Sequence, residues 1–218
     1  PTGIGIASQL ARYDISGTGF ALSSSFDVRT LERPFNATEL LFALDPGLKL
    51  IGVQIDGDDA SWSVSQEFDS AKVTLPGPLS ANAKTRIDLY AVGQLPLGNA
   101  VALPAIRPTN LVWQASDVEL RVADDLRINE LSGDGGKSLD VVNVFDDDAE
   151  SGASIRLIDP ANRILLNVAK RRSIVTCKRA FALHFTADRI QGRASLLLAT
   201  ATDTLFTLDV ESPKGWQL

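Results

Sequence analysis

Apolar and polar residues alternate along much of the chain, with the period of two that is typical of a β-strand exposed on one face. In residues 20–28, Phe20, Leu22, Phe26 and Val28 share one side, whereas Ala21, Ser23, Ser25 and Asp27 share the other. The same alternation recurs in residues 118–122, 155–157 and 181–185. These segments are therefore predicted to be half-buried strands.

Turn residues separate many further short apolar runs. Asp45-Pro46-Gly47, Asp56-Gly57, Pro76-Gly77-Pro78 and Asp159-Pro160 each interrupt a pattern that is otherwise typical of strands. No window of helical length carries a convincing apolar stripe. Many short strands between Gly, Pro and Asp turns predict an all-β fold of β-sandwich modules, with two packed sheets in each module.

Two stretches of the chain have similar sequences, and we call them the two echoes. Phe20-Ala21-Leu22 opens a segment that continues through aliphatic runs to Trp62, and Phe181-Ala182-Leu183 opens a shorter segment that ends at Trp216. Self-similarity at a long spacing is typical of arrays of supersecondary units. We therefore expect an internal repeat, in which residues 179–218 are a partial copy of residues 20–64. The pattern leaves open whether the copies are two modules or halves of one sandwich.

Residues 94–110 lie between the two echoes and hold Pro96, Gly98, Pro104 and Pro108 with almost no charge. Such a segment is stiff and extended, and it suits a linker or a strand that crosses between sheets. We place the module boundary here, with a first β-sandwich module over residues 1–106 and a second over residues 107–218. The chain also begins at Pro1 and contains no Met, which favours a piece processed or excised from a longer protein.

Net charge and composition narrow the range of partners. The formal net charge is −6 and the pI is about 4.8, which argues against nucleic acid because phosphate binding requires a clustered basic surface. The longest uncharged stretch is broken by Gly93, Pro96, Gly98 and Pro104, so no membrane insertion is expected within this chain. Cys177 is a single thiol and excludes an intrachain disulfide.

Signatures of catalysis are mostly missing from the sequence. His184 is the only histidine, and the alternation puts it on the polar side of its strand, away from any Gly-x-Ser-x-Gly motif. One His and one Cys cannot complete a zinc site of nitrogen and sulfur ligands. Cys177 alternates within an apolar strand and is expected to be a buried, inert thiol. We therefore expect no enzyme and no resident cofactor; a glycoside-acting enzyme is a less favoured alternative.

Calcium is the most credible ion, because two regions are crowded with carboxylates. The first contains Asp56, Asp58 and Asp59, and the second contains Asp146, Asp147, Asp148 and Glu150. Ca²⁺ takes six to eight oxygen ligands from flexible loops, so either region could supply some of them. Neither region matches the spacing of an EF-hand loop. Solvated acidic turns are the alternative interpretation.

Three tryptophans, Trp62, Trp113 and Trp216, raise the possibility of a platform that stacks on sugar rings. Trp62 and Trp216 occupy equivalent places in the two echoes, and a residue that recurs at the end of a recurring strand is more often part of the core. We therefore expect Trp62 and Trp216 to be buried. Polysaccharide binding remains the alternative.

The order of Phe-Ala-Leu, an aliphatic strand pair and a closing Trp resembles the tandem β-sandwich modules of large bacterial cell-envelope and surface proteins. The resemblance implies a non-catalytic scaffold or adhesion module of a larger repetitive protein. It implies an extracytoplasmic location, in the periplasm or at the cell surface, and neighbouring domains or copies of the same protein as partners. An uncovered aliphatic strand edge should make the isolated chain self-associate or depend on flanking sequence.

Overall fold

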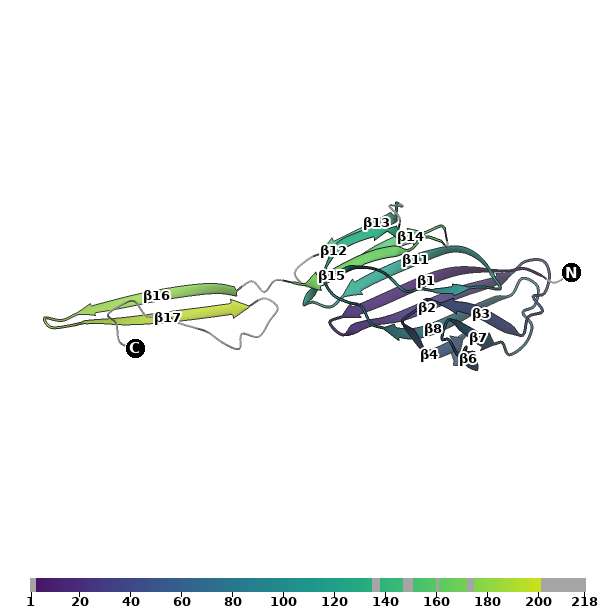
Figure 1. The fold of residues 1–218 in the computed structure, drawn as a ribbon, viewed down its shortest axis with the longest axis horizontal. Helices are drawn as coiled ribbons and strands as arrows, with labels where there is room; N and C mark the ends of the chain where they lie inside the picture. Colours follow the sequence, from purple (N-terminus) through teal and green to yellow (C-terminus); the bar gives the residue numbers. More distant parts are fainter. Residues whose placement is uncertain (1–2, 135–137, 147–150, 160, 172–174, 201–218) are drawn as a thin grey trace. The chain divides into compact units, whose positions relative to one another are not determined.

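The fold is that of a computed structural model of the 218-residue chain. The structure describes residues 3–134, 138–146, 151–159, 161–171 and 175–200. The chain divides into two compact units, Pro1–Lys170 and Arg171–Leu218. Every named element in the described residues is a β-strand and none of these residues is in an α-helix, which confirms the predicted all-β class (Figure 1).

The largest sheet of the first unit has eight strands in the order β13-β14-β11-β1-β2-β8-β4-β5. Their bounds are β1 Gly5–Ser16, β2 Gly19–Thr30, β4 Leu48–Ile55, β5 Asp58–Asp59, β8 Lys84–Gly93, β11 Val112–Val122, β13 Asp140–Asp146 and β14 Ser151–Leu157. Neighbours pair antiparallel except β1 and β11, which run parallel from the pair Ile6 and Val112 to the pair Ile15 and Val122. The N-terminal strand therefore lies in the middle of the sheet, between strands that are far from each other in sequence.

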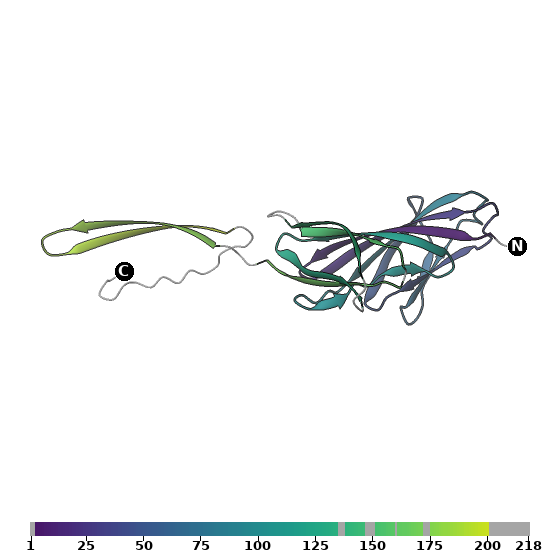
Figure 2. The ribbon, with the colours of Figure 1, turned by 90° about the horizontal axis from the view of Figure 1, so that it is seen from above.

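Two smaller sheets complete the unit (Figure 2). A four-stranded sheet has the order β10-β3-β7-β6, with β3 Glu39–Leu44, β6 Trp62–Val64, β7 Ser70–Thr74 and β10 Ile106–Pro108. A three-stranded sheet has the order β12-β15-β9, with β9 Ala100–Ala102, β12 Leu126–Gly133 and β15 Ile164–Lys170. Each is antiparallel throughout.

The inner face of the eight-stranded sheet packs against these smaller sheets in one continuous hydrophobic core. Phe26 of β2 and Phe42 of β3 are both fully buried, and their rings are tilted at 50° with centroids 5.0 Å apart. The alternation predicted for residues 20–28 is confirmed, because every even-numbered residue of that run is buried. The architecture is a β-sandwich, as the sequence pattern predicts.

The segment 94–110 is a crossing segment within the first unit. Its two short strands join different sheets: β9 pairs with β15, and β10 pairs with β3. The predicted module boundary at residues 106 and 107 thus falls inside a compact unit, whereas the boundary between the two units lies between Lys170 and Arg171. The reason is long-range pairing, since the parallel β1–β11 pair joins residues on both sides of the predicted boundary.

The described part of the second unit is a hairpin of β16 Val175–Phe185 and β17 Ile190–Thr200. The echoed triplets occupy different places in their hairpins. Phe20-Ala21-Leu22 begins the second strand of the β1–β2 hairpin, whereas Phe181-Ala182-Leu183 lies in the first strand of the β16–β17 hairpin. No helix in the described residues is long and apolar enough to cross a membrane.

Candidate functional site

The first acidic region lies at the turn between β4 and β5. Asp56 and Gly57 form this two-residue turn with φ values of 52° and 93°, which is the conformation that favours Asp-Gly in a tight hairpin. One surface groove of about 390 Å³ is lined by Asp56, Asp58 and Asp59. The last residue of β7 and the two residues after it also line this groove. The structure therefore brings the three carboxylates to one groove.

Two of these carboxylates already have hydrogen-bond donors within the protein. The Asp56 Oδ1 accepts from the Arg86 backbone N–H at 2.8 Å, and the Asp59 Oδ1 accepts from the Gln54 amide at 3.2 Å. No cluster of three metal-ligating side chains occurs in the part of the chain that the structure describes. Calcium at this turn stays a prediction, and an ion there would compete with both hydrogen bonds for oxygen ligands.

The second acidic region is described only at its first residue. Asp146 ends β13 and pairs through its backbone with Ser151 of β14. The side chain of Asp146 and residues Asp147, Asp148 and Glu150 lie outside the described residues. The calcium prediction for this region is therefore untested.

The two remaining reactive side chains lie in the β16–β17 hairpin. His184 pairs with Gln191 and is exposed, on the polar face where the alternation places it. Cys177 is exposed, so the expectation of a buried thiol is wrong for the described hairpin. The physical reason is that Cys177 lies on the apolar face as predicted, but no described residue covers that face.

The tryptophans do not share one environment. Trp62 is 37% exposed on β6, an edge strand of only three residues, so its predicted burial is wrong. Trp113 of β11 is half-buried, and its Nε1 donates to the Gln9 Oε1 at 3.2 Å. Trp216 lies outside the described residues. The described tryptophans therefore form no common platform.

A polar cluster inside the sandwich surrounds Gln9. Its amide donates to the Ser24 hydroxyl at 2.8 Å and to the Ile106 carbonyl at 3.1 Å, which ties β1 to β2 and β10. The adjoining cavity measures about 30 Å³, which is room for roughly one water molecule. This cluster joins the sheets rather than forming a binding site for a larger ligand.

Tyr13 lies beside this cluster and is 2% exposed. Its hydroxyl donates to the Pro104 carbonyl at 2.8 Å. Burial raises the pKa of this phenol well above its ordinary value, because the phenolate would lose its hydration. Tyr13 is therefore a neutral hydrogen-bond donor that fixes the crossing segment to β1.

Asp45 forms an ion-pair cluster at the turn between β3 and β4. Its side chain is 12% exposed and accepts from Arg107 at 2.9 Å and Arg163 at 3.5 Å, and the Asp45 Oδ2 accepts from the Ala105 backbone N–H at 3.1 Å. One carboxylate thus connects this turn with β10 and with the residue before β15. The sequence showed only a turn at Asp45-Pro46-Gly47, because its two arginine partners are distant in the chain.

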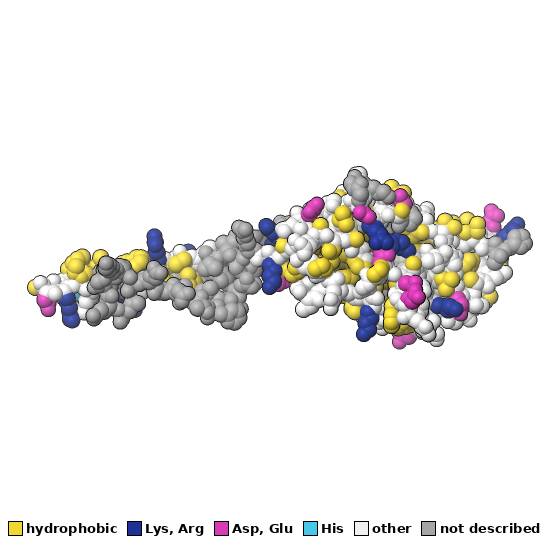
Figure 3. Space-filling view, in the orientation of Figure 1, with side chains coloured by type: hydrophobic (Ala, Val, Ile, Leu, Met, Phe, Trp, Pro, Cys, Tyr) yellow, Lys and Arg dark blue, Asp and Glu magenta, His cyan; other side chains and the backbone are white. Residues whose placement is uncertain are grey.

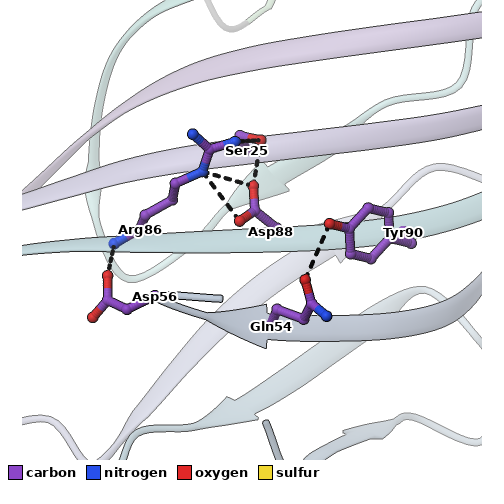
Figure 4. A network of polar contacts seen from close by, with 6 residues as sticks. All are labelled: Ser25, Gln54, Asp56, Arg86, Asp88 and Tyr90. Carbon is purple, nitrogen blue, oxygen red and sulfur yellow. Dashed lines mark hydrogen bonds and ion pairs between the residues drawn. The ribbon is translucent and has the colours of Figure 1, made fainter. Parts of the chain in front are cut away.

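The outer face of the eight-stranded sheet carries a polar network that joins several strands (Figure 4). We use the name outer face for the side opposite the core, which includes Ser23, Ser25, Arg86, Asp88 and Tyr90. Arg86 Nε donates to the two Asp88 oxygens at 3.0 and 3.1 Å, while Ser25 donates to Asp88. The hydrogen bond from Arg86 to Asp88 raises the pKa of the guanidinium further.

The ordered side chains of the outer face continue over neighbouring strands. Tyr90 donates to the Gln54 Oε1 at 3.2 Å, and Arg12 pairs with Glu119 at 2.9 Å. Arg156 pairs with Asp117 at 2.8 Å, and this hydrogen bond raises the pKa of Arg156. Sequence reasoning missed this surface, since alternation marks the residues as solvent-facing but does not show that they pair across strands.

No protein-family model matches the chain, and no curated protein matches it. Solved structures do share its fold. A two-domain M1 zinc metallopeptidase, in a substituted form bound to L-arginine, matches with a TM-score of 0.50 at 13% identity, over 87% of this chain and 46% of that one. An M1 zinc metallopeptidase from Deinococcus radiodurans matches with a TM-score of 0.51 at 12% identity, over 98% and 51%. The chain spans about half the length of these proteins, and the likeness shows the fold alone.

Proposed function

We propose that the chain is a non-catalytic structural and interaction module of a larger repetitive protein, with neighbouring domains or copies of the same protein as its partners. The outer face of the eight-stranded sheet is the binding surface. The observation that carries the proposal is the ordered polar network on that face, in which Asp88 is held by Arg86 and Ser25. An extracytoplasmic location belongs to the same proposal and rests on the sequence resemblance.

The network suits binding because its side chains are already hydrogen-bonded to one another across neighbouring strands. Side chains that are already ordered lose less conformational entropy on association, roughly 0.5–1.5 kcal/mol less for each long side chain. Arg and Tyr are also enriched at protein interfaces. Exposed apolar residues lie on the same side of the sheet, with Leu10 of β1 37% exposed and Ile51 of β4 56% exposed. A partner could therefore bury apolar area while it meets hydrogen-bonding groups at fixed positions.

The catalytic alternative is tested directly by assay of the 218-residue chain with added zinc. We expect no hydrolysis of aminoacyl p-nitroanilides or aryl glycosides above that of a heat-denatured sample. Turnover that follows the folded protein through purification, and that a point substitution removes without unfolding the chain, would overturn the non-catalytic half of the proposal.

Carbohydrate binding is a second candidate, and the exposure of Trp62 favours it. An exposed indole on an edge strand can stack on a sugar ring. Titration with soluble polysaccharides should then shift the tryptophan fluorescence, and Trp62→Ala should abolish the shift. If Trp62→Ala retains the full fluorescence shift, the shift comes from another tryptophan. The exposure of Trp62 would then no longer support carbohydrate binding.

A further inference from the structure

The turn between β6 and β7, residues 65–69, holds Phe68 in an unfavourable backbone conformation. Its φ of 57° lies in the left-handed region, which Gly and Asn adopt readily and bulky residues rarely do. The side chain is 67% exposed, so burial within the chain recovers little of this cost. Backbone strain of this kind is concentrated at active sites and ligand contacts. Phe68 is therefore a candidate for contact with a partner.

Hydrogen bonds hold the turn in this conformation. The Ser65 hydroxyl donates to the Asp69 Oδ1 at 2.7 Å, and the Phe68 backbone N–H donates to the Ser65 carbonyl at 3.1 Å. The hydrogen bond from Ser65 lowers the pKa of the Asp69 carboxyl, so Asp69 is negatively charged at neutral pH. Glu67, on the other side of Phe68 in the chain, is exposed. The turn thus presents an aromatic ring between two acidic residues.

A groove of about 730 Å³, which we call the end groove, lies at one end of the outer face. Its lining includes one row of directly paired residues that point to the same side of the sheet. In the strand order β1, β2, β8 and β4, this row consists of Asp14, Ala21, Val92 and Lys49. Three strand spacings, or about 14 Å, separate the two charged residues of the row. The end groove is thus apolar in its middle, acidic on one side and basic on the other.

The end groove has room for an aromatic side chain, because its volume is in the range of sites that hold small molecules. Ala21 and Val92 would contact such a ring in the middle of the groove. Phe68 does not line the end groove of its own chain, and it belongs to a different sheet from the strands that form the groove. A second copy of the chain must therefore supply the ring.

The charges beside the ring and the groove select one orientation. On the face of the first unit seen in Figure 3, acidic, basic and apolar side chains lie interspersed, so a partner must match individual charges. Among the described residues, Lys49 has no ion-pair partner, and neither has Glu67. Opposite charges meet if Glu67 lies toward Lys49, whereas like charges meet if it lies toward Asp14. The favourable orientation therefore places Glu67 beside Lys49.

We propose that Phe68 of one copy occupies the end groove of a second copy, with Glu67 beside Lys49 of that copy. This inference rests on the proposed function, because it names the partner and the contact of the outer face. The end groove borders the polar network, since Tyr90 is two residues from Val92 on the same face of β8. Burial of the ring in the second copy recovers the free energy that the strained, exposed Phe68 costs the isolated chain.

Sedimentation velocity of the 218-residue chain tests the contact with Phe68→Asn. Asn tolerates the left-handed conformation, so this variant should fold with an unchanged or raised melting temperature. Loss of a buried aromatic anchor should raise the dissociation constant of self-association at least about tenfold. The matched control is Ile158→Asn, since Ile158 is 70% exposed in the first unit and outside the contact. The control should associate as the wild type does.

Two further experiments test the pairing of the turn with the groove. Ala21→Arg fills the end groove, so this variant and Phe68→Asn should each be monomeric alone but form a mixed dimer when combined, because one retains the ring and the other the groove. Lys49→Glu and Glu67→Lys should each weaken association, and the chain that carries both should regain it. A mixture that stays monomeric, or a double charge reversal weaker than either single one, would overturn the contact.

The variants separate failure of this contact from failure of the proposed function. If Phe68→Asn associates as the wild type does, while Ala21→Arg with Ser23→Arg abolishes association, the proposed contact is wrong and the outer face remains the binding surface. If association survives both sets of substitutions, or if the wild type is monomeric, the contact and the proposed function are both wrong. Loss of association in both sets, with the Ile158→Asn control unchanged, supports both.

Discussion

The Asp45 cluster should contribute measurably to stability, and the exposed Arg156–Asp117 pair should not. Asp45 is 12% exposed and Arg107 24%, whereas Asp117 and Arg156 are each about half exposed. At the 2.9 Å separation of Asp45 and Arg107, the gross attraction is about 6 kcal/mol for an effective dielectric constant near 20. Desolvation offsets most of this, so we expect a net coupling free energy of about 1–3 kcal/mol.

Two double-mutant cycles measure these couplings by urea unfolding, with intrinsic tryptophan fluorescence, to which Trp62 and Trp113 of the first unit contribute, as the reporter. The first cycle uses Asp45→Asn and Arg107→Gln, and the second uses Asp117→Asn and Arg156→Gln. The exposed pair should show less than about 1 kcal/mol, and this coupling should vanish in about 1 M salt. The Asp45 coupling should persist in salt. Equal couplings, or one below about 0.5 kcal/mol for Asp45 and Arg107, would refute the assignment of that cluster as a structural connection.

Tyr13, Trp62 and the acidic turn each give a further prediction. The folded-state pKa of Tyr13 is raised, so its stabilising contribution is complete below its unfolded-state pKa of about 10 and is lost as the pH rises above that pKa. Tyr13→Phe should therefore flatten the fall in melting temperature at alkaline pH. An unchanged fall would contradict the effect of burial on the Tyr13 pKa. Trp62→Ala should cost roughly 1–2 kcal/mol in thermal unfolding, and a cost of about 3–5 kcal/mol would instead indicate a buried indole. If calcium binds the acidic turn, millimolar calcium should raise the melting temperature, and Asp58→Ala should remove this rise. Identical melting curves in calcium and in chelator would mean that the carboxylates of this turn are solvated and bind no calcium.

The sequence predicts strands well because alternation is a local property. The run from Phe20 to Val28 shows which residues face the core without reference to any other strand, and the Asp56-Gly57 pair marks a tight hairpin turn. Alternation does not show which strand lies next to which. The parallel pairing of β1 with β11 depends on packing across about a hundred residues, so the predicted boundary near residue 106 could not take it into account.

Prediction of the candidate site residues from the sequence has the same limit, because it does not show which distant residues come together. Asp45 was recognisable as a turn residue, but Arg107 and Arg163 reach it only through the folded arrangement of three sheets. Recurrence in the sequence predicts that Trp62 is in the core, yet recurrence does not determine exposure, and a three-residue edge strand leaves Trp62 accessible. The network around Asp88 had no signal in the sequence, since Ser, Arg and Asp on alternating positions are also ordinary solvent-facing residues.

The most direct test of the interaction role is sedimentation velocity of the 218-residue chain up to near-millimolar concentration. The outer-face variant combines Ala21→Arg with Ser23→Arg, which crowd the face without removing Asp88 or its partners. The control is Leu41→Arg, at an exposed position of β3 in the four-stranded sheet. We expect reversible self-association of the wild type and of the control, and its loss in the outer-face variant. A wild type that is strictly monomeric, or association that survives the outer-face substitutions, would contradict it.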